Sequence, residues 1–149
     1  MRDLPVDRIS KQHRSWNMSR IKCRDTNPEL IVRSVLHRLG YRFRLHAKNL
    51  PGKPDIVLPK WRCVILVHGC FWHRHPRCKL AYTPKSRTKF WNTKFLQNVE
   101  RDHFIRHKLR RMGWKVYVVW ECQTYRPDGL AVKLDQLIRK SEALPSQGR

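Results

Sequence analysis

The chain has 149 residues, 40% of them hydrophobic, which predicts one globular domain with a core of its own. Lys and Arg number 33 against 11 Asp and Glu, so the formal net charge is +22. No apolar run approaches the roughly 18 residues that span a bilayer, and the N-terminal MRDLPVDRIS lacks the apolar region of a signal peptide. We therefore expect an intracellular protein that binds a polyanion, with nucleic acid favoured over an anionic membrane.

The N-terminal segment, residues 1–25, is polar and basic. Within SKQHRSWNMSR the large apolar side chains are Trp16 and Met18. This pattern fits a loose arm, and it also fits a basic arm that becomes ordered on nucleic acid. A helix is predicted next, over DTNPELIVRSVLHRLG, with Thr26 or Asn27 as its cap and Gly40 at its end.

Three short strands are predicted after this helix. YRFRLHA alternates the apolar Tyr41, Phe43 and Leu45 with polar residues, as a half-buried strand does. After the turn LPGKP come the β-rich runs DIVLP and WRCVILVHG, separated by Pro59 and Lys60. These two runs predict a hairpin.

The second half of the chain begins with an irregular segment at residues 69–87. A long helix that ends at Gly113 is predicted over TKFWNTKFLQNVERDHFIRHKLRRMG. A strand covered on both faces is predicted over WKVYVVWEC, and a last helix over DGLAVKLDQLIRKSEAL. A helix that joins two strands favours a parallel crossover. We therefore expect a single α/β domain at residues 26–143, followed by a loose tail at 144–149.

The segment HGCFWHRHPRC, residues 68–78, concentrates the side chains that bind metals. The chain has five cysteines, and an odd number without a secretory signal favours metal ligation over disulfides. Cys70, His75 and Cys78, with Cys122 at the end of the last strand, predict a tetrahedral zinc site that ties this loop to the sheet. Because the spacing is uncommon among zinc fingers, scattered buried thiols are the alternative.

Two histidines and two carboxylates are candidates for catalysis. His68 and His73 lie beside the predicted ligands, and a neutral imidazole can accept a proton near pH 7; histidines without chemical function fit the pattern as well. Asp55 begins a strand, where it can bind Mg²⁺ together with phosphate oxygens. Glu29 can approach it from the first helix, or it can serve only the helix dipole.

Aromatic residues on a basic surface can stack on bases or wedge between them. Phe71 and Trp72 in the ligand-rich loop and Trp91 at the start of the long helix are the candidates. Core packing is the alternative, and it is favoured for Trp114 and Trp120 within the last strand.

Four motifs together resemble those of the very short patch repair (Vsr) DNA mismatch endonucleases. In chain order they are PGKPDIVLP, HGCFWHRHPRC, TKFWNTKFLQNVERD and GWKVYVVWEC. The resemblance implies a restriction-endonuclease-like fold, with a mixed central sheet flanked by helices and a structural zinc site. It implies a Mg²⁺-dependent hydrolase that nicks one strand of double-stranded DNA 5′ to the T of a T:G mismatch, which arises by deamination of 5-methylcytosine. Such an enzyme would act in the bacterial cytoplasm, on the nucleoid when bound to DNA, beside other mismatch-repair proteins and a repair polymerase. The oligomeric state is left open by the sequence, and a monomer is the default expectation because one nick needs one site.

The resemblance also implies roles by position. Asp55 would bind Mg²⁺ through its carboxylate and Val67 through its backbone carbonyl. His73 would be the general base, with support from His68, and Glu29 would join the active site. The implied zinc ligands are Cys70, His75, Cys78 and Cys122. The implied wedge beside the mismatch is Phe71, Trp72 and Trp91, with Met18 entering from the minor groove as the arm orders.

Two features depart from related patterns. The strand CVILVHG lacks the acid and lysine that many nucleases of this fold carry, as is usual in this branch, so a histidine must replace the lysine. HPRC has two residues between His75 and Cys78, where some members have one. Two rival functions also fit the charge and the cysteines: a non-catalytic zinc-dependent DNA-binding module, and a nuclease of the same fold that acts in restriction or on another lesion.

Overall fold

The computed structural model describes residues 25–142. The helices in this part are α2 (Asn27–Arg38), α3 (Thr88–Arg111) and α4 (Pro127–Glu142). The strands are β1 (Arg44–Leu45), β2 (Ile56–Leu58), β3 (Cys63–His68) and β4 (Lys115–Trp120), and two 3-10 helices, η1 (Pro59–Trp61) and η2 (Glu121–Tyr125), follow β2 and β4. Met18, which the resemblance implies as part of the wedge, lies outside the described residues.

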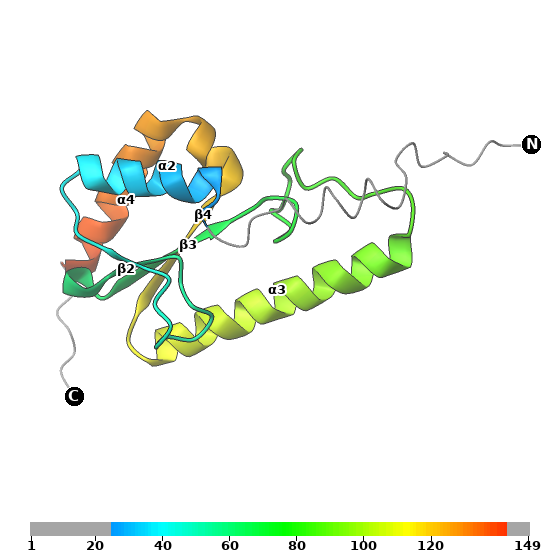
Figure 1. Ribbon diagram of the computed structural model, residues 1–149, viewed down its shortest axis with the longest axis horizontal. Helices are drawn as coiled ribbons and strands as arrows, with labels where there is room; N and C mark the ends of the chain where they lie inside the picture. Colours follow the sequence, from blue (N-terminus) through cyan, green and yellow to red (C-terminus); the bar gives the residue numbers. More distant parts are fainter. Residues whose placement is uncertain (1–24, 143–149) are drawn as a thin grey trace, which may run out of the picture.

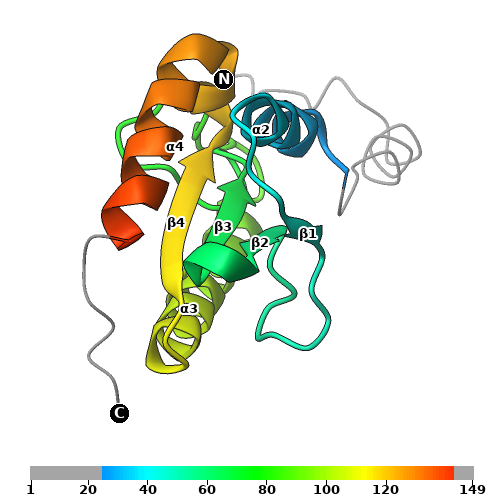
Figure 2. The ribbon, with the colours of Figure 1, turned by 90° about the vertical axis from the view of Figure 1, so that its left-hand side faces the viewer.

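The strands form one mixed sheet in the order β1-β2-β3-β4 (Figure 2). β2 and β3 are antiparallel and joined through η1, so the predicted hairpin is confirmed. β3 and β4 are parallel, which confirms the crossover predicted from the long helix between them. Their register pairs His68 with Trp120 at the carboxyl ends of the two strands.

Helices cover both faces of the sheet (Figure 1). Alternate strand residues such as Ile56 and Ile65 pack with α2 and α4, whereas their neighbours Val57 and Val64 pack with Leu109 of α3. This alternation follows from the two-residue period of a strand, and it explains why all six residues of β3 are buried. The α/β expectation of a mixed sheet flanked by helices is confirmed.

The helix α2 begins where its sequence predicts. The Thr26 hydroxyl accepts a hydrogen bond from the Glu29 N–H at 3.4 Å, so Thr26 is the N-cap. Leu39 is the C-cap and Gly40 follows with φ of +85°, the left-handed conformation that glycine adopts without strain. None of the helices in the part of the chain described is long and apolar enough to cross a membrane.

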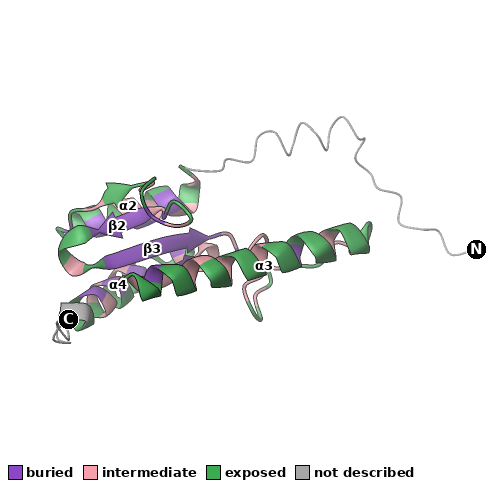
Figure 3. Cartoon of the chain, turned by 90° about the horizontal axis from the view of Figure 1, so that it is seen from below, coloured by how far each residue is buried: buried purple, intermediate pink, exposed green. Residues whose placement is uncertain are grey.

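Two strand predictions need correction. The strand expected over YRFRLHA is only Arg44–Leu45, because His46 turns the chain with a positive φ of 47°, and Leu45 is exposed. Within β4, which was expected to be covered on both faces, Val116 and Val119 are buried and the other residues are half-buried. β4 is an edge strand of the sheet, and the helix α3 beside it is mostly exposed, with only Phe95 and Leu109 buried (Figure 3).

Candidate active site and metal centre

A cavity of about 940 Å³ opens where α2, the end of β3, the irregular loop and α3 meet. Asp55, which directly precedes β2, lines this cavity together with Glu29 of α2 and Val67 and His68 of β3. His73 reaches it from the loop. Five residues that the sequence made candidates for catalysis or Mg²⁺ binding, distributed over four segments, therefore share one cavity.

The Asp55 carboxylate is held inside this cavity by the backbone. Its Oδ2 accepts a hydrogen bond from the Val67 N–H at 2.8 Å. Burial raises the pKa of Asp55 to about 6, the Val67 hydrogen bond opposes this shift, and the negative charge of Glu29 adds to it. A carboxylate that is partly desolvated and faces a second carboxylate is stabilised by a bound cation, so the electrostatics of the cavity favour a metal here.

Glu29 is only 3% exposed, and one of its carboxylate oxygens accepts two hydrogen bonds. Its Oε2 accepts hydrogen bonds from the Asp25 N–H at 2.8 Å and from the Arg33 guanidinium at 3.2 Å. Arg33 also pairs with the Asp25 carboxylate at 2.7 Å and contacts His46 at 3.1 Å. Asp25, Glu29 and His46 could together hold a metal ion by distance, but the guanidinium already supplies the positive charge between them. We therefore interpret this group as an ion-pair network at the start of α2.

The two catalytic candidates among the histidines are stacked. The rings of His68 and His73 are parallel within 8°, with centroids 3.9 Å apart. The Nδ1 of His73 lies 2.6 Å from Oδ2 of Asp102, a residue of α3. Burial, and then the positive charge of His73, lower the pKa of His68 to about 3, so His68 is neutral near pH 7.

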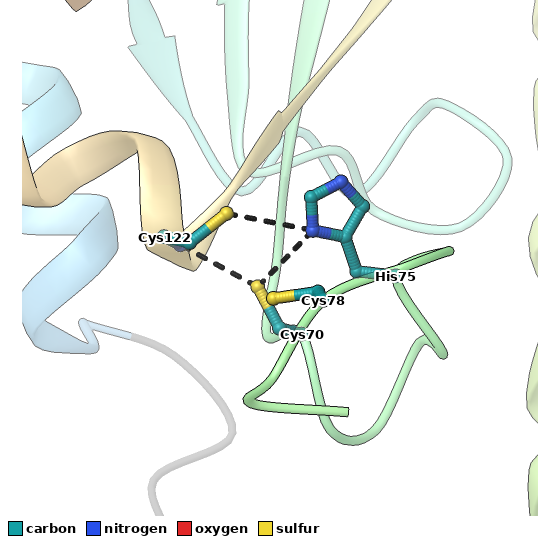
Figure 4. A group of neighbouring side chains, drawn as sticks. All are labelled: Cys70, His75, Cys78 and Cys122. Atoms are coloured by element: carbon teal, nitrogen blue, oxygen red, sulfur yellow. Dashed lines mark hydrogen bonds between the residues drawn. The ribbon is translucent and has the colours of Figure 1, made fainter. Parts of the chain in front are cut away.

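Three thiols and an imidazole converge at the far side of the loop (Figure 4). The ligand atoms of Cys70, His75, Cys78 and Cys122 all lie within 4.8 Å of one another. His75 Nδ1 is 3.6 Å from Cys70 Sγ and 3.4 Å from Cys122 Sγ. A tetrahedral zinc ion with ordinary bond lengths separates a sulfur and a nitrogen ligand by about 3.6 Å. The four predicted ligands thus have the spacing of a single closed metal site.

The electrostatics of these four residues also suit a metal. Burial raises the pKa of the Cys70 thiol to about 12 and raises that of Cys122 as well, and a bound cation would favour the thiolate form of each. Burial lowers the pKa of His75, which keeps its imidazole neutral and able to donate a lone pair. The Leu80 N–H lowers the pKa of the Cys78 thiol. Cys63 lies buried in β3 and is not part of the cluster.

The aromatic candidates gather into one cluster beside the cavity. The centroid of the Phe71 ring lies 5.2 Å from that of Trp72 and 5.5 Å from that of Trp91, and the two indoles are 5.8 Å apart. All three are half-buried, and Phe95 closes the base of the cluster at 5.2 Å from Phe71. The Asn98 side chain donates to the Trp72 carbonyl at 3.2 Å, which ties the loop to α3.

Asp102 is a residue that sequence reasoning missed. The signal was present, because Phe95, Asp102 and Leu109 are seven residues apart and so lie on one side of α3, and the first and last of these are the buried residues of that helix. A carboxylate on the buried side of a helix in a chain with 11 acids requires a partner. Trp120 was expected in the core, yet it is half-buried and its ring stacks on that of His75.

Comparison with known proteins agrees with this arrangement. The family model described as DNA mismatch endonuclease Vsr matches residues 6–80. The DNA mismatch endonuclease Vsr of Escherichia coli strain K12 is 47% identical over 117 residues, which are 78% of this chain and 74% of that protein. The type II nicking enzyme V.XorIIP of Xanthomonas oryzae pv. oryzae is 44% identical over 136 residues, covering 91% of this chain and 99% of the relative.

A second nicking enzyme, V.NmeAIP of Neisseria meningitidis, is 40% identical over 135 residues, covering 91% of this chain and 96% of that protein. The family model spans half of the chain, and three relatives match it at 40% identity or more over most of their length. The mixed α/β fold and the relatives together support the expected restriction-endonuclease-like architecture. The chain therefore belongs to the Vsr family of DNA mismatch endonucleases, and it is an endonuclease.

Proposed function

We propose that this endonuclease nicks one strand of duplex DNA on the 5′ side of the T of a T:G mismatch, in a reaction that depends on Mg²⁺. The observation that carries the proposal is the convergence of a desolvated carboxylate, a carboxylate-bound histidine and an aromatic cluster at one cavity in a chain of net charge +22. Each of these features supplies one requirement: metal binding, proton transfer and distortion of the duplex.

Asp55 is the proposed Mg²⁺ carboxylate. Its raised pKa of about 6 leaves it ionised at pH 7, and Glu29 nearby adds to the attraction for a cation. The Val67 N–H orients the Asp55 carboxylate, and the Val67 carbonyl is proposed as a second ligand. When bound, Mg²⁺ supplies Lewis-acid stabilisation of the charge that develops on the scissile phosphate.

His73 is the proposed general base for the attacking water. Asp102 binds its Nδ1, which leaves Nε2 as the atom that accepts the proton. The Asp102 carboxylate then stabilises the imidazolium that forms, as the aspartate does for the histidine in catalytic triads. His68, stacked beneath His73, adds no repulsion to this imidazolium because its own pKa is too low for it to be protonated.

The aromatic cluster of Phe71, Trp72 and Trp91 is the proposed wedge for the base stack. Inserting rings between bases costs a few kcal/mol of unstacking, and the cost is smallest at a mismatch. The wedge therefore selects mismatched DNA before any base is read. Met18, the fourth proposed member, belongs to the segment outside the described residues, and we propose that residues 1–25 order on the minor-groove side.

The four-residue metal centre is proposed to hold one structural zinc ion. Three thiolates and one imidazole that fill a tetrahedron leave no open position for substrate, which is the pattern of a structural site. Its ligands come from the loop and from η2, so the ion fixes the loop that carries His73 and two rings of the wedge. Localisation in the bacterial cytoplasm and on the nucleoid, and function as a monomer beside other repair proteins, are part of this proposal.

The test compares the nicking of a T:G duplex with that of the matched C:G duplex. Both duplexes are assayed with Mg²⁺ and without Mg²⁺, and the Mg²⁺-free buffer contains no EDTA. We expect a single nick 5′ to the T, loss of nicking in Asp55→Ala and His73→Ala, and unchanged nicking in the exposed controls Asp128→Ala and His103→Ala. Full activity in Asp55→Ala or His73→Ala would overturn the assigned roles.

The two rivals give different results in the same assay. A DNA-binding module would retain the T:G duplex without cleaving it, although the family membership argues against this outcome. A nuclease for another lesion would cleave other mismatches or damaged bases at a higher rate than T:G. A panel of T:G duplexes with different flanking base pairs then defines the sequence context.

A further inference from the structure

A continuous series of rings joins the metal centre to the catalytic histidine. The imidazole of His75 stacks on the indole of Trp120, with centroids 4.2 Å apart and planes within 12°. The indole also meets the ring of His68 edge-on at 5.4 Å and 75°. His68 stacks on His73 at 3.9 Å, and His73 binds Asp102. Five side chains from the loop, β3, β4 and α3 thus form one packed series.

The backbone explains why Trp120 stands between the two sites. The register of the parallel strands β3 and β4 pairs His68 with Trp120, so their side chains leave the sheet side by side. The Trp120 N–H donates to the Gln123 Oε1 at 2.9 Å, which ends the strand and begins η2. Cys122, two residues on, belongs to the four-residue metal centre. The position of Trp120 is therefore fixed by its pairing with His68 in the sheet and by η2, which carries Cys122.

Trp120 is half-buried and is not one of the residues that line the cavity. We propose that Trp120 is a positioning residue that transmits the geometry of the metal centre to the His68–His73 pair. An imidazole that donates a lone pair to a dication is electron-poor, and the electron-rich face of an indole attracts such a ring. The bound metal then holds His75, His75 holds Trp120, and the indole edge supports His68 beneath His73.

The consequence is that the metal does more than fold the loop. The orientation of His73 toward the attacking water depends on the ring beneath it, and a displacement of about 1 Å in a catalytic group can cost about 100-fold in rate. This inference rests on the proposed role of His73. It predicts that Trp120 affects the chemical step and leaves the affinity for DNA unchanged.

The first experiment compares Trp120→Phe and Trp120→Leu with the wild-type protein. DNA affinity is measured in Ca²⁺, the nicking rate under single turnover in Mg²⁺, and zinc content and the thermal midpoint are recorded for each variant. Leu keeps apolar volume but has no ring, so we expect nicking to slow by about 10-fold or more with zinc and DNA affinity retained. Phe keeps a ring plane and should restore most of the rate. Trp114→Leu, at the other end of β4, is the matched control, because Trp114 packs with the core on the α3 side.

The second experiment needs no catalysis. The zinc of the wild-type protein is exchanged for Cd²⁺, a larger ion with the same preference for thiolates, and the imidazole resonances of the histidines are recorded by NMR. We expect shifts at His75 and also at His68 and His73, with smaller shifts at the exposed His37, which lies in the last turn of α2 outside this series. In Trp120→Phe the same exchange should still move the His73 resonances.

The inference is overturned if zinc-loaded Trp120→Leu nicks at the wild-type rate, or if metal exchange moves the resonances of His75 and leaves those of His73 unchanged. If the leucine variant does not fold, Trp120→Met takes its place in the nicking assay, because methionine also fills apolar volume without a ring. Failure of the proposed function is distinguishable, because then the wild-type protein itself does not nick a T:G duplex while the resonances still respond to the metal.

Discussion

The hydrogen bond between His73 and Asp102 offers a sharp test of the active site. Asp102→Asn keeps the size of the side chain and replaces an ionised acceptor by a neutral amide. At 2.6 Å the wild-type contact is a short, charge-assisted bond between partly buried groups, whose side chains are 30% and 13% exposed. Hydrogen bonds to charged groups contribute about 1.5–3 kcal/mol, which corresponds to about 10-fold to 150-fold in rate. Because His73 is partly open to solvent, we expect a loss of about 10-fold to 100-fold.

The assay is single-turnover nicking of a T:G duplex at saturating enzyme, with DNA affinity measured separately in Ca²⁺. The affinity should not change, because Asp102 stabilises a charge that develops only during the reaction. Glu100→Gln, two residues away and exposed on the same helix, is the charge-matched control.

A double variant separates this mechanism from general damage. His73→Ala together with Asp102→Asn should be no slower than His73→Ala alone, because Asp102 acts only through His73. An Asp102→Asn protein that nicks at the wild-type rate, or a further loss in the double variant, would refute the reasoning.

Three further predictions concern metals and pH. Cys122→Ser should reduce the zinc content from about one equivalent and lower the thermal midpoint, measured by metal analysis and calorimetry; full zinc content would contradict the ligand assignment. Asp55 has a folded pKa of about 6, above the unfolded value of 3.8, so its ionisation lowers the free energy of unfolding as pH rises between these values. Asp55→Asn should therefore abolish nicking, yet at pH 7 without Mg²⁺ its free energy of unfolding should exceed that of the wild type by on the order of 2–3 kcal/mol. Denaturant unfolding measures this difference, and a less stable variant would count against the desolvation of Asp55. His68 has a folded pKa of about 3, below the unfolded value of 6.5, so its stabilising contribution is complete above about pH 6.5 and declines as pH falls toward 3. The free energy of unfolding of His68→Gln should therefore fall less steeply than that of the wild type between pH 7 and pH 5.

The sequence alone was sufficient for most of the elements and for the residue types of the site. The capping threonine of α2, the hairpin of β2 and β3 and the long helix α3 are local patterns, determined by side-chain period and by the conformations of proline and glycine. The Cys and His content of the loop indicated a metal centre, and Asp55 at the start of a strand indicated a cation site. The motifs then implied the family, because their order and spacing are specific.

Only the tertiary structure decided which distant residues meet. Cys122 N–H contacts Cys70 Sγ across 52 positions of sequence, and Asp102 reaches His73 across 29. The first contact depends on the parallel pairing of β3 with β4 and the second on the packing of α3 against the loop, and no local pattern encodes either arrangement. Trp120 is a further example that local sequence could not place. Its apolar strand predicted a core residue, whereas the register with β3 sets it beside His68, between the metal centre and the active site. Local sequence specifies which side chains leave each element, and long-range packing specifies what they meet.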